Sequence, residues 1–445
     1  MKKIYLSFLC VCLSLGLFSQ TEKKAELIKK NWNFGALPTI TFDTDLGFQY
    51  GALVNLFDYG DGSRYPKYNR SLYFEVSRFT KGSGINRFYF DSDRLIKGLQ
   101  TSVDLSYLSD QAYDFYGFNG YDAVYQPNWI DAESGNYKTR MFYKYDRKLF
   151  RFKVDLQGKL FGDHVRWISG FNLQNFDIGS VNLEKLNKGK KGNDVLPDVA
   201  GLFERYQQWG VISKEEANGG FVPTIKAGIV YDSRNNRPNP MKGIWTEAVL
   251  EGAPEFLGAE SSFTKLSLIH RQYFTLVPEN LSFVYRLAYQ TTVSGHTPFY
   301  YQSQVITSVL TGALSEGLGG AKTLRGILRN RIVGDGFIYG NMEMRWKFVR
   351  FNWIKNNFYL GLNGFADFGK VTKKIPATFN YVGATGYYSF DPEYNKLDAE
   401  KLHTSFGAGL RIAMNENFVI AIDYGKALNE QDGTSGMYIG LNYLF

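Results

Sequence analysis

The sequence feature that most constrains the fold is a two-residue alternation of apolar and charged side chains. It is clearest in residues 147–160, where Phe150, Phe152, Val154, Leu156 and Leu160 alternate with Arg147, Arg151, Lys153, Asp155, Gln157 and Lys159. Successive side chains of a β-strand point to opposite faces, so this segment forms a strand with one apolar and one charged face. A row of charges this dense must face water, whereas the apolar row is typical of contact with lipid.

The same alternation recurs along the chain and predicts about sixteen strands. They lie at residues 38–43, 48–56, 71–79, 85–93, 99–107, 147–160, 165–176, 222–232, 243–253, 263–276, 281–293, 337–348, 358–369, 403–414, 418–426 and 437–445. An even number of strands brings both ends of a barrel to one side of the membrane, with short turns on that side and longer loops on the other. The sequence therefore predicts an all-β protein, a transmembrane antiparallel β-barrel.

The beginning of the chain is typical of a secretory signal. Two lysines at positions 2 and 3 precede an apolar run at 4–18, and polar sequence follows. Such a segment is too short to span a membrane and remain there. We therefore expect three parts: a signal peptide at 1–19, a short periplasmic N-terminal segment at 20–36 and the barrel at 37–445.

Composition supports a membrane barrel and argues against several other classes. Both cysteines, Cys10 and Cys12, lie in the expected signal, and no later run of about eighteen apolar residues could form a spanning helix. The aromatic fraction of 17%, with 31 Tyr and 36 Phe, suits aromatic girdles at both membrane interfaces. The net charge of +8 comes from basic residues that mostly alternate along strands, which indicates a basic lumen or basic rims and no nucleic-acid partner.

A glycine-rich stretch with one arginine precedes the strand at 337–348 and carries a family resemblance. It reads Leu318-Gly319-Gly320, then Leu324-Arg325-Gly326, Gly334 and Asn341-x-Glu343-x-Arg345. Further motifs are Tyr231-Asp232-Ser233-Arg234, Asn239-Pro240-x-Lys242-Gly243, Phe365-x-Asp367-x-Gly369, Phe406-Gly407-x-Gly409-x-Arg411 and Asp423-Tyr424-Gly425. Together, over residues 221–445, they resemble the BamA/TamA superfamily of outer-membrane barrels, also called bacterial surface antigen proteins.

The resemblance implies that this extracellular loop folds inward and locks in the lumen. Arg325 would pair with Glu343 and Asp367 on the barrel wall, and Gly326, Gly319 and Gly320 would let the loop turn. The alternation agrees, because Met342, Met344, Ala366 and Phe368 take the opposite face from the two carboxylates. The alternative is an arginine exposed on an ordinary surface loop.

The end of the chain, Tyr438-x-Gly440-x-x-Tyr443-x-Phe445, resembles the signal by which barrel proteins are recognised for insertion. Gly440, Tyr443 and Phe445 would carry that signal. The same residues also fit a plain lipid-facing strand, with Met437, Ile439, Leu441, Tyr443 and Phe445 pointing outward. The two interpretations are compatible.

No catalytic, metal or cofactor site is expected. Gly319-Gly320-Ala321-Lys322-Thr323 is superficially like a phosphate-binding loop, but that motif needs a glycine directly before the lysine and a helix after it. The four histidines stand singly, without a nucleophile motif nearby, so neither hydrolytic catalysis nor a metal cluster is predicted.

The resemblance implies assembly or translocation at the bacterial outer membrane, in contact with its lipid and lipopolysaccharide. The segment at 20–36 is too short for the periplasmic client-receiving domains of the family, so we expect other subunits of a barrel-assembly or secretion complex. The mechanism of the barrel itself would be the sideways opening of a weak seam between its first and last strands. The alternative is a structural or passive pore-type barrel whose long extracellular loops bind a partner.

Overall fold

The computed structural model describes residues 26–43, 47–308, 317–383, 386–388 and 390–445 and shows one antiparallel sheet of sixteen strands in chain order. The strands are β1 (Trp32–Asp43), β2 (Gly47–Asp58), β3 (Arg70–Phe79), β4 (Gly84–Ile96), β5 (Leu99–Asp114), β6 (Lys144–Phe161), β7 (Val165–Gly179), β8 (Gly219–Asp232), β9 (Gly243–Ala253), β10 (Phe263–Val277), β11 (Leu281–Gly295), β12 (Gly336–Trp353), β13 (Asn356–Lys373), β16 (His403–Met414), β17 (Phe418–Ala427) and β18 (Ser435–Leu441). The predicted all-β barrel architecture is confirmed.

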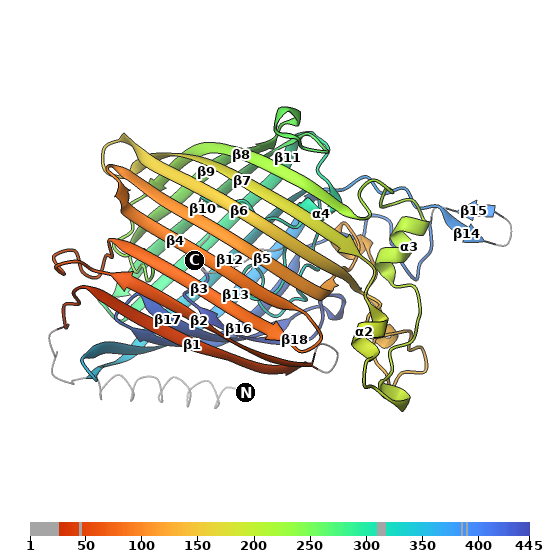
Figure 1. Cartoon of the computed structure of the whole chain (residues 1–445), viewed down its shortest axis with the longest axis horizontal. Helices are drawn as coiled ribbons and strands as arrows, with labels where there is room; N and C mark the ends of the chain where they lie inside the picture. Colours follow the sequence, from red (N-terminus) through yellow and green to blue (C-terminus); the bar gives the residue numbers. More distant parts are fainter. Residues whose placement is uncertain (1–25, 44–46, 309–316, 384–385, 389) are drawn as a thin grey trace, which may run out of the picture.

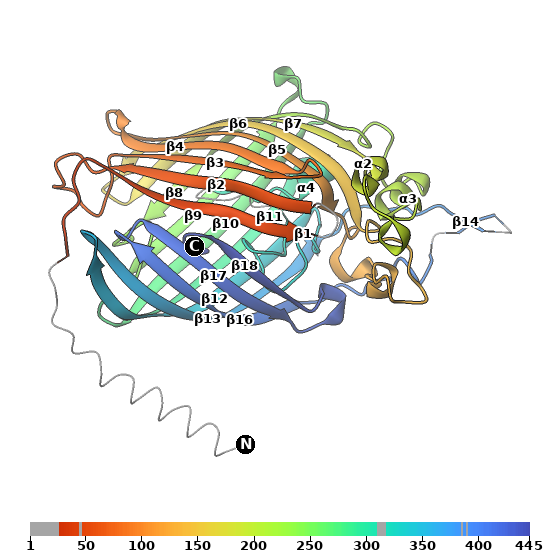
Figure 2. The ribbon, with the colours of Figure 1, turned by 60° about the horizontal axis from the view of Figure 1, so that its bottom comes forward.

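The sheet rolls up so that its first and last strands, β1 and β18, face each other along a seam (Figures 1 and 2). Short turns join the strands at one end, which we call the turn end. The long connections gather at the opposite end, the loop end. The start of β1 and the end of β18 both lie at the turn end, as an even-stranded barrel requires.

The loop end also carries a small hairpin and short helices. The hairpin is β14 (Tyr381–Gly383) with β15 (Gly386–Tyr388), and the α-helices are α2 (Leu183–Asn187), α3 (Leu202–Gln208) and α4 (Phe299–Gln302). Single 3-10 turns lie at Gly120–Asp122, Pro127–Trp129, Gly192–Asp194, Glu255–Leu257 and Glu430–Asp432. None of the helices in the described ranges has both the length and the apolar character needed to cross a membrane.

The first strand is longer than the sequence indicated. We expected it at 38–43 because proline favours a strand start, but β1 begins at Trp32, which pairs with Asp58 of β2. Pro38 lies inside the strand, and an edge strand tolerates a proline there because one side has no ladder to lose. The strand thus takes in Trp32 to Ala36, assigned above to the segment before the barrel, while the expected signal at 1–19 lies outside the described residues.

The charged face of each strand points into the lumen. In β6, Arg147, Arg151 and Asp155 are buried, whereas Phe150 on the other face is 42% exposed. The buried charges form pairs between strands: Arg151 Nη2 lies 2.9 Å from Asp104 Oδ1 of β5. Ion pairs between strands therefore line much of the lumen.

Aromatic side chains from four loops close the loop end. Phe115 and Phe118 precede β6, Phe203 and Tyr206 lie on α3, and they pack with further rings into one buried cluster. The other members include Tyr116, Tyr125, Trp129, Phe142, Tyr143, Trp209, Phe299, Tyr300, Tyr301, Tyr381 and Tyr394. Each large ring removes much apolar area from water, so this cluster holds the loops together as a cap over the lumen.

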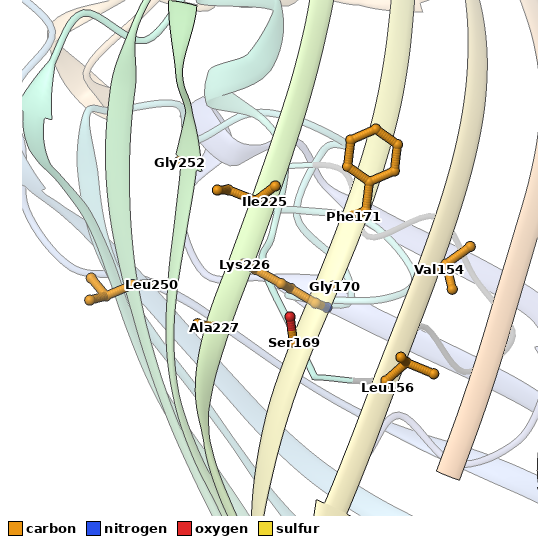
Figure 3. Close-up of a pocket in the computed structure, with 10 residues that line it drawn as sticks. All are labelled: Val154, Leu156, Ser169, Gly170, Phe171, Ile225, Lys226, Ala227, Leu250 and Gly252. Atoms are coloured by element: carbon orange, nitrogen blue, oxygen red, sulfur yellow. The ribbon is translucent and has the colours of Figure 1, made fainter. Parts of the chain in front are cut away.

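A depression of about 600 Å³ lies on the outer wall of the barrel (Figure 3). It crosses β6 to β9, with Ile225 and Leu250 exposed at its edges. Lys226 reaches from β8 toward Gly170 on β7, and its Nζ donates a hydrogen bond of 2.9 Å to Asp155 Oδ2. A Cβ on Gly170 would lie 2.2 Å from Asp155 Oδ1 and 2.7 Å from Lys226 Cε. The glycine thus makes room for a buried ion pair.

Gly170→Ala should therefore lower the stability of the barrel. The new methyl group must displace the Lys226–Asp155 pair, and we expect the free energy of unfolding to fall by about 1–3 kcal/mol. Urea unfolding in detergent micelles, followed by tryptophan fluorescence, measures this. Gly364→Ala is the matched control, because a Cβ there meets open space. Equal stability of the two variants would show that the wall accommodates the methyl group.

Candidate functional site

The loop between β11 and β12 enters the lumen. Leu318 and Ile332 form an isolated backbone bridge at its neck. Beyond the neck, Leu324 and Ile327 are buried, packing with apolar side chains of the wall that include Ile269, Phe337, Tyr339 and Val371. Two buried leucine- or isoleucine-sized side chains contribute about 3–6 kcal/mol of transfer free energy, enough to hold the loop inside.

Arg325 lies at the tip of this loop and is fully buried. Its Nε and Nη2 each donate a hydrogen bond of 2.9 Å to one oxygen of Asp367, and its backbone N–H donates to the same carboxylate at 2.9 Å. Nη1 donates to Glu343 Oε1 at 2.6 Å. The guanidinium carbon lies 3.5 Å from the centre of the Phe365 ring. The structure thus brings Arg325, Glu343 and Asp367 together.

The register of β12 and β13 places the two carboxylates on one patch of the inner wall. Asn341 pairs with Asp367, and Glu343 pairs with Phe365 one step along the same face. Diagonal neighbours in a sheet are close enough for one long side chain to touch both. A guanidinium suits this position because its planar fork makes two parallel bonds to a carboxylate and stays charged.

Two more arginines complete the network. Arg345 Nε donates to Glu343 Oε2 at 2.6 Å, and Arg411 binds both oxygens of Asp423 at 2.9 Å. Asp423 Oδ2 lies 3.8 Å from Arg325 Nη1. Three arginines therefore alternate with three carboxylates, so each buried charge has a partner of opposite sign. Arg345, Arg411 and Asp423 stood in recognised motifs, but nothing in the sequence assigned them this contact.

The glycines let the loop approach the wall backbone to backbone. Gly326 has φ +90°, and a Cβ on it would lie 2.5 Å from the backbone nitrogen of Lys426 in β17. Its N–H donates to the hydroxyl of Tyr438 in β18 at 3.0 Å. Gly319, with φ +121°, passes so close to Leu328 that a Cβ would lie 1.9 Å from its carbonyl oxygen, and Gly320 adopts φ +80°. Only glycine fits these positions without strain.

The last residues correct one prediction. Met437 and Ile439 are 70% and 63% exposed, as expected for lipid-facing side chains, but Leu441, Tyr443 and Phe445 are buried. The strand ends at Leu441, and Asn442 adopts φ +66°. Residues 442–445, which we call the C-terminal tail, then lie inside the lumen. Gly440 remains in β18, opposite Ala421.

Arginines of the lumen hold the C-terminal tail. Arg345 Nη2 donates to the carbonyl oxygen of Phe445 at 3.0 Å, and the guanidinium carbon of Arg345 lies 4.3 Å from the centre of the Tyr443 ring. Phe445 packs with Trp245, Tyr273 and other side chains of β7 to β11. Alternation predicts side-chain direction only while a strand stays in its ladder, so this inward turn was missed. Whether Gly440, Tyr443 and Phe445 act as an insertion signal stays a prediction.

Removal of the tail from the wall changes the seam. In the described part of the chain, β1 pairs only with β2 and β18 pairs only with β17. Because β18 ends at Leu441, no strand lies between the first residues of β17 and β1. These residues therefore face β1 directly, and a Cβ on Gly35 would lie 2.3 Å from the Phe418 ring. Phe418 and Leu441 pack with Leu37, Leu53 and other apolar side chains of β1 to β4. Side-chain packing, not a backbone ladder, holds this seam.

Comparisons with known proteins match this architecture. A family profile described as the Omp85 superfamily domain matches residues 67–445. The solved structure of CdiB from Escherichia coli is similar, with 10% identity, a TM-score of 0.52 and coverage of 93% of this chain and 62% of that one. BamA from Haemophilus ducreyi lacking POTRA domains 1-3 gives 13% identity, a TM-score of 0.48, and 93% and 70% coverage. This chain spans less than two thirds of the CdiB chain. No curated protein matches.

Arg325→Ala should release the loop from the wall. The substitution leaves Glu343 and Asp367 without their shared cation, and losing one partner of a buried ion pair costs about 3–5 kcal/mol. We expect a higher single-channel conductance in planar bilayers and a lower folded yield. Arg325→Lys keeps the positive charge but lacks the planar guanidinium, so its conductance and folded yield should lie between those of the wild type and the alanine variant. Unchanged conductance, yield and heat-modifiable gel mobility in the alanine variant would contradict the role.

Gly425→Ala tests the loop contact without touching a charge. A Cβ on Gly425 would lie 2.7 Å from the carbonyl carbon of Arg325 and from the nitrogen of Gly326. Backbone atoms cannot swing aside, so the tip must withdraw. We expect trypsin to cut after Arg325 in the variant, while the wild type stays protected, with cleavage read by mass spectrometry. Gly364→Ala again serves as control, and equal protection in all three proteins would refute the contact.

Proposed function

Because this chain belongs to the Omp85 superfamily of bacterial outer-membrane barrels, we propose that it assembles or translocates proteins at the outer membrane by opening its seam sideways. The turn end then faces the periplasm and the loop end faces outward. The single observation that carries the proposal is the seam itself. It is the one place along the sheet order where neighbouring described strands lack a backbone ladder.

The seam presents an edge that another strand could use. β1 has twelve residues, and only its β2 side is paired in the described part of the chain. An edge strand of this length carries a row of free backbone N–H and C=O groups. Proteins bind extended segments by adding them to such an edge, where main-chain hydrogen bonds supply affinity. A client strand would pair with β1 once the side-chain contacts part.

The inward loop supports the proposal because it braces one side of the seam. Arg325 binds β12 and β13, Gly326 donates to Tyr438 of β18, and Lys322 Nζ donates to the carbonyl oxygen of Leu441 at 3.4 Å. These contacts tie the last strands to the loop as one body. Opening would then occur between that body and β1, without disturbing the charge network.

The proposed activity needs no catalytic group. The superfamily consists of transport and assembly barrels, and we infer that this chain likewise works by binding and moving strands. Its outward side chains, among them Phe34, Ile40 and Ile229, are exposed for contact with membrane lipid and lipopolysaccharide. Further subunits of an assembly or secretion complex would bind at the periplasmic turns or the outer cap.

A disulfide across the seam tests the proposal. A Cβ at position 35 would lie 2.4 Å from Phe418 Cγ, which places the two Cβ atoms within about 4 Å, a separation that suits a disulfide. Gly35→Cys with Phe418→Cys should cross-link without other thiols, since Cys10 and Cys12 lie in the expected signal. In the native host we expect the oxidised double variant to deplete other outer-membrane proteins, measured by quantitative proteomics. Reductant should restore them.

The control is a disulfide between two neighbouring strands that do not form the seam. Ala52 of β2 pairs directly with Val76 of β3, so Ala52→Cys with Val76→Cys cross-links a ladder that never opens. This variant and each single cysteine should behave as wild type. If the locked seam leaves the outer-membrane proteome and growth unchanged, the chain is instead a structural or passive pore-type barrel whose loops bind a partner.

A further inference from the structure

A charged cavity of about 320 Å³ lies at the turn end of the barrel. The turn from β2 to β3 forms one side of it, and the turn from β8 to β9 forms another. Side chains from β4, β5, β7, β8 and the turn before β17 complete the walls, namely Asp91, Asp93, Gln100, Arg166, Asp232 and Asn417. We call this cavity the vestibule.

The vestibule carries more positive than negative charge. Its lining holds five cationic side chains, Arg64, Lys67, Arg166, Arg234 and Arg237, against three carboxylates, Asp91, Asp93 and Asp232. The lining therefore has a formal charge of +2. Low-dielectric walls concentrate the field of such a cluster, which raises the local concentration of anions.

Two of the carboxylates are each shared by two cations of the lining. Asp93 accepts a hydrogen bond of 3.0 Å from Arg64 and lies 2.6 Å from Lys67 Nζ. Asp232 binds Arg234 through hydrogen bonds of 2.9 and 2.8 Å, whereas Arg237 Nε is 3.7 Å away. Each cluster thus keeps one unit of positive charge that its carboxylate does not neutralise.

Arg166 faces the vestibule from β7 without an anion of its own. Among the described residues, its side chain forms no hydrogen bond and no ion pair. The third carboxylate, Asp91, is already engaged, since Tyr68 donates to it at 2.7 Å and Gln100 at 2.6 Å. A guanidinium held inside a cavity beside Arg237, with its donors unused, is poised to bind an anionic ligand.

We propose that the vestibule binds a dianionic oxyanion, a phosphate or phosphomonoester group, with Arg166 and Arg237 as its principal ligands. A charge of −2 would neutralise the lining. Guanidinium forks match the spacing of phosphate oxygens, and both arginines have donors to spare. The group comes either from a free phosphate or from the headgroup of a phospholipid, and both sources present the same chemistry to these side chains.

The β8–β9 turn is built to hold Arg237 in place. Asn235 Oδ1 accepts from the backbone nitrogens of Met241 and Lys242 at 3.1 and 3.0 Å, which closes the turn on itself. Arg237 Nη1 donates to Gln100 Oε1 at 2.8 Å. Asp232 and Arg234 of the first sequence motif line the site, which gives these two residues a role independent of the proposed assembly function.

Phosphate binding by the purified full chain in detergent micelles tests the site. Inorganic phosphate is titrated at pH 8 and low salt by calorimetry, and dihexanoyl phosphatidic acid below its micellar concentration is titrated in parallel. We expect saturable binding of one phosphoryl group per chain. Arg166→Gln with Arg237→Gln should weaken it at least about tenfold, the scale of one lost charged hydrogen bond. Arg166→Gln alone removes no internal partner and should fold normally, so it keeps the test informative.

Lys159→Gln is the matched control, since Lys159 is an exposed cation at the same end that pairs with Asp163 outside the vestibule. It should bind as wild type. Tighter binding of the lipid than of phosphate identifies a headgroup as the ligand, and equal affinities identify free phosphate. Absence of binding to either probe, or binding that the arginine substitutions leave unchanged, would overturn the proposal.

Discussion

The buried arginine at the loop tip is the interaction on which the interior of this barrel depends. Burying a guanidinium without an anionic partner costs many kcal/mol of desolvation free energy. The loop can therefore enter the lumen only where carboxylates are placed to bind the guanidinium. Asp367 and Glu343 meet that need, and Arg345 and Arg411 keep the remaining charges balanced. Neither wall nor loop is stable in this arrangement alone. The inward loop and the charged inner faces of β12, β13 and β17 therefore require each other.

The same network accounts for the unusual seam. Arg345 binds Glu343 with one part of its guanidinium and the carbonyl of Phe445 with another, so the C-terminal tail is drawn toward the charge cluster. Each residue that leaves the wall removes ladder bonds worth about 1 kcal/mol apiece. A full ladder along a twelve-residue strand would contribute on the order of 10 kcal/mol, which the seam lacks. The wall is thus weakest beside the body that the loop holds most firmly.

Local patterns predicted much of this architecture from the sequence. Alternation gave the sixteen strands and the inward direction of Glu343 and Asp367, because side-chain direction follows from neighbours along one strand. It failed at Trp32, where proline was taken as a strand start, and at Tyr443 and Phe445, which follow tertiary contacts with Arg345 and Trp245. The sequence also did not predict the aromatic cap or the vestibule, since each is formed by turns or loops that lie far apart in the sequence.

The arginines of the barrel interior differ in whether they are paired with a carboxylate. Arg325, Arg345 and Arg411 each reach a carboxylate within 2.9 Å, so these ion pairs help to hold the fold. Arg166 reaches none in the described ranges, although it stands in a cavity with the same polar character. Arg166 is half-buried, and its charge makes no contact that holds the barrel, so stability alone does not require a cation there. The contrast within one lumen is therefore an argument that Arg166 is kept for a ligand and not for the barrel.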